Sequence, residues 1–160
     1  MGIIIKTPEQ IEGIRRSSQL AGNTLKMIEG YIKDGVSTEY LDKIIEEFIR
    51  DNGAIPATLG YNGYTKSSCI SPNEVVCHGV PSPDVILKHG DIFNIDVTTI
   101  LNGYYGDTSK MYSIGEISDK AQQLIDATRH SLTLGIQQVF PGNYFGNIGF
   151  TIARYIQMKG

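Results

Sequence analysis

The sequence predicts an α/β (α+β) fold in which helices cover one face of an antiparallel sheet. Two observations support this prediction. An Asn-Gly dipeptide stands between two β-prone runs at residues 92–112, and segments with helix caps and periodic apolar residues lie on either side of those runs. At 160 residues, 41% of them hydrophobic, the chain is long enough for a real core, so we expect a single domain over residues 1–160.

The first expected helix opens at Thr7-Pro-Glu-Gln10. Thr7 is a typical N-cap, Pro8 suits the first helical position, and Gln10 can complete a capping box. The helix should run toward Tyr31 and end before Gly35. Its expected buried stripe consists of Ile11, Ile14, Leu25, Ile28 and their neighbours.

Three further helices are expected from the same kinds of signal. Ser37 caps the second helix, and Gly53 is placed to end it. Ser118 opens the third helix, which should extend to about Val139. After a Pro-Gly break, Asn143 caps the last helix.

The Asn102-Gly103 dipeptide predicts a two-residue hairpin with a type I′ turn, because both central residues of that turn need a positive φ. Such a turn determines the cross-strand register. The expected pairs are Leu101 with Tyr104, Thr98 with Asp107, and Asp96 with Ser109.

Two aspartates on this hairpin form the candidate site. With the expected register, Asp96 and Asp107 point to the same side of the sheet and are diagonal neighbours, roughly 7 Å apart at Cβ. Aspartate is depleted from strand interiors, and two carboxylates at this spacing suit a bridging cation. The alternative is that each aspartate only accepts hydrogen bonds from Thr98, Ser109 or the backbone. The opposite face is expected to be apolar, through Phe93, Ile95, Val97, Thr99 and Leu101.

Composition limits the classes of partner. A net charge of −3 and a pI near 5.6, without a basic patch, argue against a direct nucleic-acid or membrane-surface binder. There is no apolar stretch of membrane-spanning length and no cleavable signal, so the cytoplasm is the expected compartment.

Cys69 and Cys77 lack the spacing of a zinc or disulfide framework and are expected to be free thiols.

Several motifs together resemble the bacterial type I methionine aminopeptidase family, over essentially the whole chain. They are Ile5-Lys-Thr-Pro-Glu9, Leu59-Gly-Tyr-Asn-Gly-Tyr64, Lys66-Ser-Ser-Cys69, Val75-Val-Cys-His-Gly-Val-Pro81, Asn94-Ile-Asp-Val-Thr98 and Gly106-Asp-Thr-Ser-Lys110. The resemblance implies the N-terminal half of a pita-bread fold and a centre of two divalent metal ions, such as Co, Mn or Fe. It also implies removal of the initiator methionine from nascent proteins when the next residue is small.

The resemblance assigns roles to individual residues. Asp96 is similar to the family's aspartate that binds one metal with both oxygens, and Asp107 to the aspartate that bridges both metals. His78 resembles the histidine that contacts the scissile peptide, although a histidine in this context alone is more often a loop residue. The residues similar to the lining of the methionine pocket are Tyr61, Tyr64 and Cys69. Thr58 departs from the cysteine that some relatives carry there.

The family's remaining ligands, a histidine and two glutamates, are expected in a C-terminal half that lies beyond Gly160 and is absent from this chain. His130 and Glu116 are no substitutes, since they fall on a helix and in a turn. Two carboxylates alone should bind metal weakly. The full-length family is expected to be monomeric, whereas this chain could form oligomers or take a C-terminal partner chain, because the sheet carrying Ile95, Val97 and Leu101 should have an incompletely covered face or edge.

Two classes of function stay open. The first is a metal-dependent aminopeptidase that acts on the N-terminal peptide of nascent proteins and could do so at the ribosome. The second is a catalytically incompetent module that binds a peptide or protein in the same cleft. The retained Asp96, Asp107 and His78 favour the enzyme, and the absent half favours the module. Proline-specific or creatine-type relatives are a weaker third choice.

Overall fold

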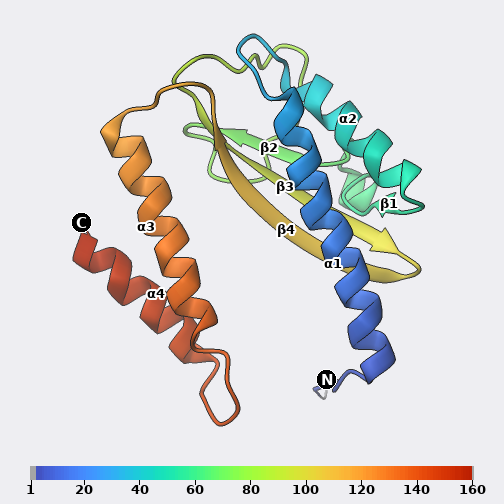
Figure 1. The fold of residues 1–160 in the computed structure, drawn as a ribbon, viewed down its shortest axis with the longest axis vertical. Helices are drawn as coiled ribbons and strands as arrows, with labels where there is room; N and C mark the ends of the chain where they lie inside the picture. The colour runs from blue at the N-terminus through green and yellow to red at the C-terminus, as the bar shows by residue number, and fades with distance from the viewer. Residues whose placement is uncertain (1–2, 160) are drawn as a thin grey trace. The chain divides into compact units, whose positions relative to one another are not determined.

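The computed structural model describes residues 3–159 and divides into two compact units, Met1–Glu116 and Ile117–Gly160 (Figure 1). The first unit contains α1 (Pro8–Ile28), the 3₁₀ turn η1 (Glu29–Tyr31), α2 (Thr38–Asp51), β1 (Ile55–Pro56), η2 (Tyr61–Gly63), β2 (Cys69–Pro72), β3 (Ile92–Leu101) and β4 (Tyr104–Ser113). The second contains α3 (Asp119–Ile136) and α4 (Gly146–Lys159). The α/β class with an antiparallel sheet is confirmed.

The caps of the first two helices are those that the sequence predicts. At α1, the Thr7 hydroxyl accepts a hydrogen bond from the Gln10 amide at 3.3 Å, and the Thr7 amide donates to Gln10 Oε1 at 2.9 Å. At α2, the Ser37 hydroxyl accepts from the Tyr40 amide. Helix α2 ends at Asp51 with Asn52 as its C-cap, and Gly53 follows with a φ of +73°, the left-handed conformation favoured after a helix C-terminus.

The predicted buried stripe of α1 is partly wrong. Ile11 is 46% exposed and Ile14 is only partly buried. The first turns of α1 extend past the tip of the β3–β4 hairpin (Figure 1). Ile11 and Ile14 share a surface of the helix with Arg15, Ser18 and Gln19, whereas Gly13 is the residue that faces the hairpin residue Tyr104. The residues of α1 that are buried are Ser17, Leu20, Ala21, Thr24, Leu25 and Ile28.

The sheet has four antiparallel strands, with β3 paired to β1, β2 and β4. All three predicted pairs of the hairpin are confirmed, namely Leu101 with Tyr104, Thr98 with Asp107, and Asp96 with Ser109. The turn residues Asn102 and Gly103 have φ values of +52° and +81°, as a type I′ turn requires. The register therefore follows from the turn chemistry.

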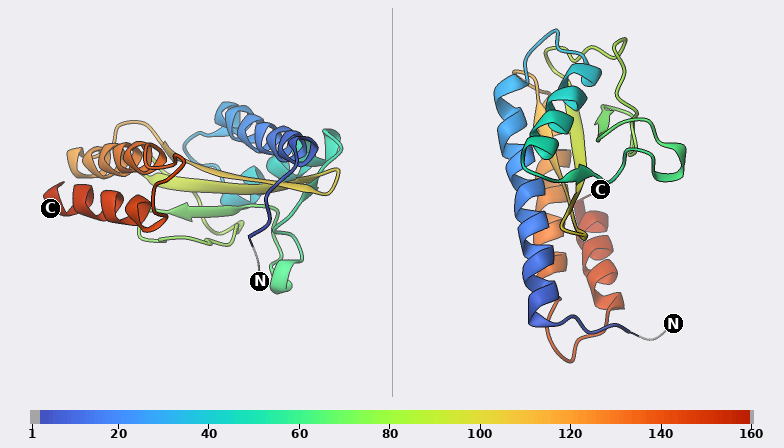
Figure 2. Two further views of the ribbon diagram at one scale, coloured as in Figure 1. Left: turned by 90° about the horizontal axis from the view of Figure 1, so that it is seen from below. Right: turned by 90° about the vertical axis from the view of Figure 1, so that its right-hand side faces the viewer.

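The apolar face of β3 is closed within the first unit, so an incompletely covered face is not found there, whereas within residues 3–159 β4 pairs with β3 alone and leaves an open edge of the sheet. Phe93, Ile95 and Val97 are fully buried in one core cluster with residues of α1 and α2. Helix α1 runs along one side of the β3–β4 hairpin (Figure 2). The members contributed by the two helices include Leu20, Leu25, Ile28, Leu41, Ile45 and Ile49. Two helices bring enough apolar surface to cover this short sheet.

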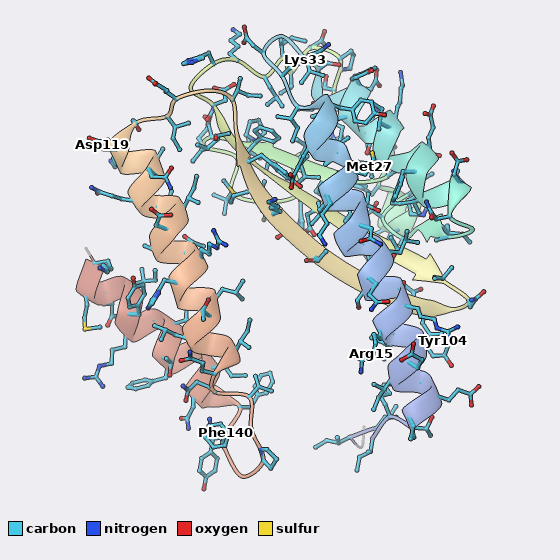
Figure 3. All side chains as sticks on the ribbon, in the orientation of Figure 1. Arg15, Met27, Lys33, Tyr104, Asp119 and Phe140 are labelled. Carbon is cyan, nitrogen blue, oxygen red and sulfur yellow. The ribbon has the colours of Figure 1, made fainter. Side chains whose placement is uncertain are left out.

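Helix α1 approaches the hairpin closely at two glycines. A Cβ atom on Gly106 would stand 2.3 Å from the backbone carbon of Ser17, and a Cβ atom on Gly13 would stand 2.4 Å from the Tyr104 ring, near the hairpin end (Figure 3). Between them, the Thr99 hydroxyl donates to the Ser17 carbonyl at 3.0 Å. The helix and the hairpin are thus joined by backbone contact and buried polar bonds as well as by apolar packing.

The second unit is a helical hairpin. The Ser118 hydroxyl accepts from the Ala121 amide, so the predicted cap of α3 is confirmed. Helix α4 begins at Gly146, later than predicted. The side-chain oxygen of Asn143 accepts hydrogen bonds from the Tyr144 amide and from the Asn147 side chain, and does not cap the helix at its own position. No helix within residues 3–159 has both the length and the apolar character needed to cross a membrane.

Candidate functional site

The two predicted site carboxylates lie on the polar face of the hairpin. Burial alternates along β3, with Phe93, Ile95 and Val97 buried and Asp96 only partly buried between them. Asp107 extends from β4 and is exposed. The alternation follows from the two-residue period of a strand, which directs Asp96 away from the core.

The surroundings of Asp96 raise the pKa of its carboxyl above the usual aspartate range. The largest cause is burial, and the second is the negative charge of Asp107 close by. His78 acts in the opposite direction and lowers the same pKa. Asp107 and His78 thus both lie near enough for their charges to act on Asp96, although the three residues come from two strands and a separate loop.

The raised pKa of Asp96 predicts a pH-dependent cost to stability. A carboxyl with a folded-state pKa above its unfolded value is favourable below the unfolded pKa, and that stability is lost as pH rises through the folded pKa. Asp96→Asn should therefore stabilise the metal-free chain at pH 7 by about 1 kcal/mol. The gain should disappear as the pH falls below the usual aspartate range.

Thermal unfolding in a chelator, at a series of pH values, measures this effect. Asp84→Asn, on an exposed loop, serves as the control and should leave the pH dependence unchanged. An Asp96→Asn variant that is less stable than the parent at pH 7 would show that the ionised carboxylate stabilises the fold.

The donor set fits part of a divalent metal site. Carboxylate oxygens are hard donors suited to Mn, Co or Fe. The negative charge of Asp107 raises the pKa of Asp96, so a bound cation would relieve the repulsion between the two carboxylates. Within residues 3–159, no group of three or more His, Cys, Asp or Glu side chains is arranged to hold a metal ion. Asp96 and Asp107 can therefore supply two ligands, and a bound ion needs further donors.

The loop that presents His78 is anchored to β2. The Ile70 amide donates to the Gly79 carbonyl at 2.9 Å, and the Gly79 amide donates to the Ser71 hydroxyl at 3.0 Å. A Cβ atom on Gly79 would stand 2.2 Å from the Ile70 carbonyl oxygen, so only glycine allows this approach. His78 itself has a φ of +55°, an uncommon conformation for a residue with a side chain. The backbone thus holds an exposed imidazole at the polar face.

Two of the predicted pocket residues lie beside these groups. Cys69 is opposite Asp96 in the β2–β3 register and is 7% exposed, and burial raises the pKa of its thiol. The Tyr64 hydroxyl donates to the carbonyls of Ser68 at 3.0 Å and Gly79 at 3.2 Å. Burial, and then the nearby Cys69 thiol, raise the pKa of Tyr64. Both cysteines are free thiols, as expected.

Tyr61 and Thr58 occupy the loop that precedes Tyr64. Tyr61 lies in η2 and is 71% exposed, so it does not pack beside Tyr64 and Cys69 as a buried residue. Thr58 donates its hydroxyl to the Lys66 carbonyl at 3.1 Å, which joins the two ends of the loop. Thr58, which stands where some relatives of the family carry a cysteine, is therefore held by a hydrogen bond to the Lys66 backbone.

Sequence reasoning missed Asp42. This residue is 4% exposed and lies on the buried face of α2, where its carboxylate accepts hydrogen bonds from Ser67 and Ser68. The available signal was its place in the apolar stripe of that helix, between Leu41 and Ile45. An acidic residue in a buried stripe needs a partner, and the partner is 25 residues away in sequence.

The chain matches known proteins along nearly its whole length. The sequence pattern of metallopeptidase family M24 matches residues 12–160. The chain is 48% identical to methionine aminopeptidase of Escherichia coli strain K12, over all of this chain and 61% of that protein. It is 44% identical to methionine aminopeptidase B of Synechocystis, over 99% of this chain and 60% of that protein. The chain thus spans about 61% of the length of the curated relatives it matches.

Solved structures give the same result for the fold. The crystal structure of methionine aminopeptidase from Rickettsia prowazekii superposes with a TM-score of 0.96 at 44% identity, covering 99% of this chain and 63% of that one. Xaa-Pro dipeptidase from Bacillus anthracis superposes with a TM-score of 0.87 at 23% identity, over 98% of this chain and 42% of that one, and shows a shared fold alone. The predicted pita-bread topology is confirmed.

Proposed function

Because the chain belongs to metallopeptidase family M24, we propose that it takes part in the metal-dependent removal of the initiator methionine from new polypeptides whose second residue is small. The observation that supports this most directly is that Asp96 and Asp107 share one face of the hairpin, with His78 near enough for its charge to act on Asp96. The similarity to methionine aminopeptidases supports the substrate class.

In this proposal Asp96 and Asp107 hold two divalent ions, such as Co, Mn or Fe. When bound, such ions polarise a carbonyl oxygen and lower the pKa of a coordinated water. The raised pKa of Asp96 means that protons compete with the ions, so we expect binding to weaken as pH falls. Beyond water molecules, further donors would come from a segment such as the longer relatives have or from a partner chain.

His78 acts on the substrate. Its exposed imidazole stands near Asp96 on a loop whose neighbouring glycine is hydrogen-bonded to β2, so a donor is held in place before substrate arrives. A fixed donor near the scissile amide contributes most when charge develops on the tetrahedral intermediate. Tyr64 and Cys69, with Tyr61 from the preceding loop, line a pocket for the unbranched methionine side chain.

The substrate is the N-terminal peptide of a new protein, and we place the reaction in the cytoplasm, at or near the ribosome where such N-termini first appear. The acidic net charge of −3 gives no support to direct nucleic-acid binding. A peptide-binding module without turnover is the second candidate, supported by the incomplete donor set within the described residues.

An assay with Met-Ala-Ser and Leu-Ala-Ser peptides separates the two candidates. The chain is tested with Mn or Co, alone and combined with a C-terminal segment taken from one of the longer relatives. Release of methionine, but not leucine, in either preparation supports the proposed aminopeptidase. Saturable peptide binding without product in both preparations supports the binding module instead.

Replacing His78 by alanine should lower kcat by roughly 10²-fold or more and change KM far less, because the lost interaction belongs to the transition state. Steady-state kinetics on Met-Ala-Ser in the active preparation measures both constants. His89→Ala, on an exposed loop residue outside the site, is the matched control and should leave them unchanged. A large rise in KM at constant kcat would make His78 a ground-state binding residue.

A further inference from the structure

Residues 66–68, which we call the strap, lead into β2 and are held against one face of α2. That face presents three acidic side chains at helical spacing, Glu39, Asp42 and Glu46. Glu39 pairs with the Lys66 ammonium at 2.7 Å, and Glu46 accepts from the Ser67 hydroxyl at 2.8 Å. Asp42 accepts from both serines, so each acid of the row contacts the strap.

Asp42, in the middle of this row, makes the most numerous contacts. Its Oδ1 accepts from the Ser68 amide at 2.8 Å, the Ser68 hydroxyl at 2.7 Å and the Ser67 amide at 3.1 Å. At 4% exposure, its carboxylate has little access to solvent. If the strap moved away, the carboxylate and two amides would lose partners in a poorly hydrated place, which is costly. The strap is therefore held in one position.

The strap also supports the residues around the candidate site. The Ser68 carbonyl accepts from the Tyr64 hydroxyl, and that hydroxyl also donates to Gly79, the residue after His78. The residue that follows the strap, Cys69, pairs with Asp96. Asp42 is thus connected through Ser68 to two parts of the site. Tyr64 links Ser68 to the loop of His78, and Cys69 links it to β3, which carries Asp96.

We propose that Asp42 is a positioning residue of this site, which sets where Tyr64 and Cys69 stand relative to Asp96 and His78 by holding Ser67 and Ser68. Asp42 lies on α2, on the far side of the strap, and acts only through other residues. The kinetic part of this inference rests on the proposed function, whereas its structural part does not.

Three variants test the structural part. Asp42→Ala removes every hydrogen bond that Asp42 makes to the strap, and Asp42→Asn keeps a side-chain oxygen that can accept the three shortest of those bonds. Glu47→Ala removes an exposed acid from the same helix and is the control. Hydrogen exchange at the Ser67 and Ser68 amides and the NMR signals of His78 and Cys69 are measured in each.

In Asp42→Ala, the two amides should exchange roughly 10- to 100-fold faster, and the signals of His78 and Cys69 should shift. Asp42→Asn should stay near the parent protein, and Glu47→Ala should match it. Faster exchange with unchanged His78 and Cys69 signals would overturn the proposal, since Asp42 would then only anchor the strap. If Asp42→Ala does not fold, Ser68→Ala, which loses the hydroxyl bond to Asp42, should still shift the His78 signal; an unchanged His78 signal would equally overturn the proposal.

The kinetic part is tested in the active preparation. Asp42→Ala should lower kcat/KM for Met-Ala-Ser by roughly 10- to 100-fold at unchanged metal affinity, because small displacements of a catalytic group have effects of this size. Asp42→Asn should restore most of the rate. A loss that asparagine does not restore would contradict positioning through these hydrogen bonds. Absence of activity in the parent protein counts against the proposed function alone, and the exchange experiment then decides the positioning role.

Discussion

Asp107→Asn should abolish aminopeptidase turnover, with a loss of at least about 10³-fold, and should weaken the binding of Mn or Co. The amide lacks the negative charge and the second anionic oxygen that a bridging ligand uses, and metal coordination accounts for several kcal/mol of transition-state stabilisation. Because Asp107 is exposed on β4, the free energy of unfolding of the metal-free chain should change by no more than about 0.5 kcal/mol.

Calorimetric titration with Mn or Co and turnover of Met-Ala-Ser are measured on the same preparations. Asp119→Asn, at an exposed position in the second unit, is the matched control and should leave both unchanged. Tight binding of two equivalents that survives Asp107→Asn would show that other residues form the metal site.

Gly106→Ala should destabilise the chain strongly, by about 3 kcal/mol or more. The new Cβ atom would stand 2.3 Å from backbone atoms of Ser17 and Ser18, which no side-chain rotation can relieve. Either α1 moves away from the hairpin, or β4 shifts next to Asp107. The first outcome weakens the buried bonds between Ser17 and Thr99, and the second displaces a proposed metal ligand.

Gly22→Ala is the matched control, because a Cβ atom at this position of α1 meets nothing within 4 Å. It should be neutral or stabilise the chain by about 0.5–1 kcal/mol through helix propensity. Urea unfolding of both variants measures the difference. A Gly106→Ala variant as stable as the parent would contradict this prediction. It would mean that α1 and the hairpin can separate enough for a methyl group and still keep the hydrogen bonds between Ser17 and Thr99.

The sequence by itself determined the features that depend on neighbouring residues. The Asn102-Gly103 turn sets the hairpin register, since only a few residue types adopt two successive positive φ values. That register places Asp96 and Asp107 on one face, as the structure confirms. The helix caps at Thr7, Ser37 and Ser118 were predictable for the same reason, because a cap involves residues three apart.

Features that depend on distant residues were decided only by the tertiary structure. Ile11 has the right spacing for burial, yet it is 46% exposed and shares a surface with Ile14, Arg15, Ser18 and Gln19. Family resemblance, and no local pattern, indicated that His78 belongs beside Asp96. Asp42 was overlooked because its partners are 25 and 26 residues away. Periodicity reports which face of an element is apolar, but which polar groups meet across that face depends on how the elements pack.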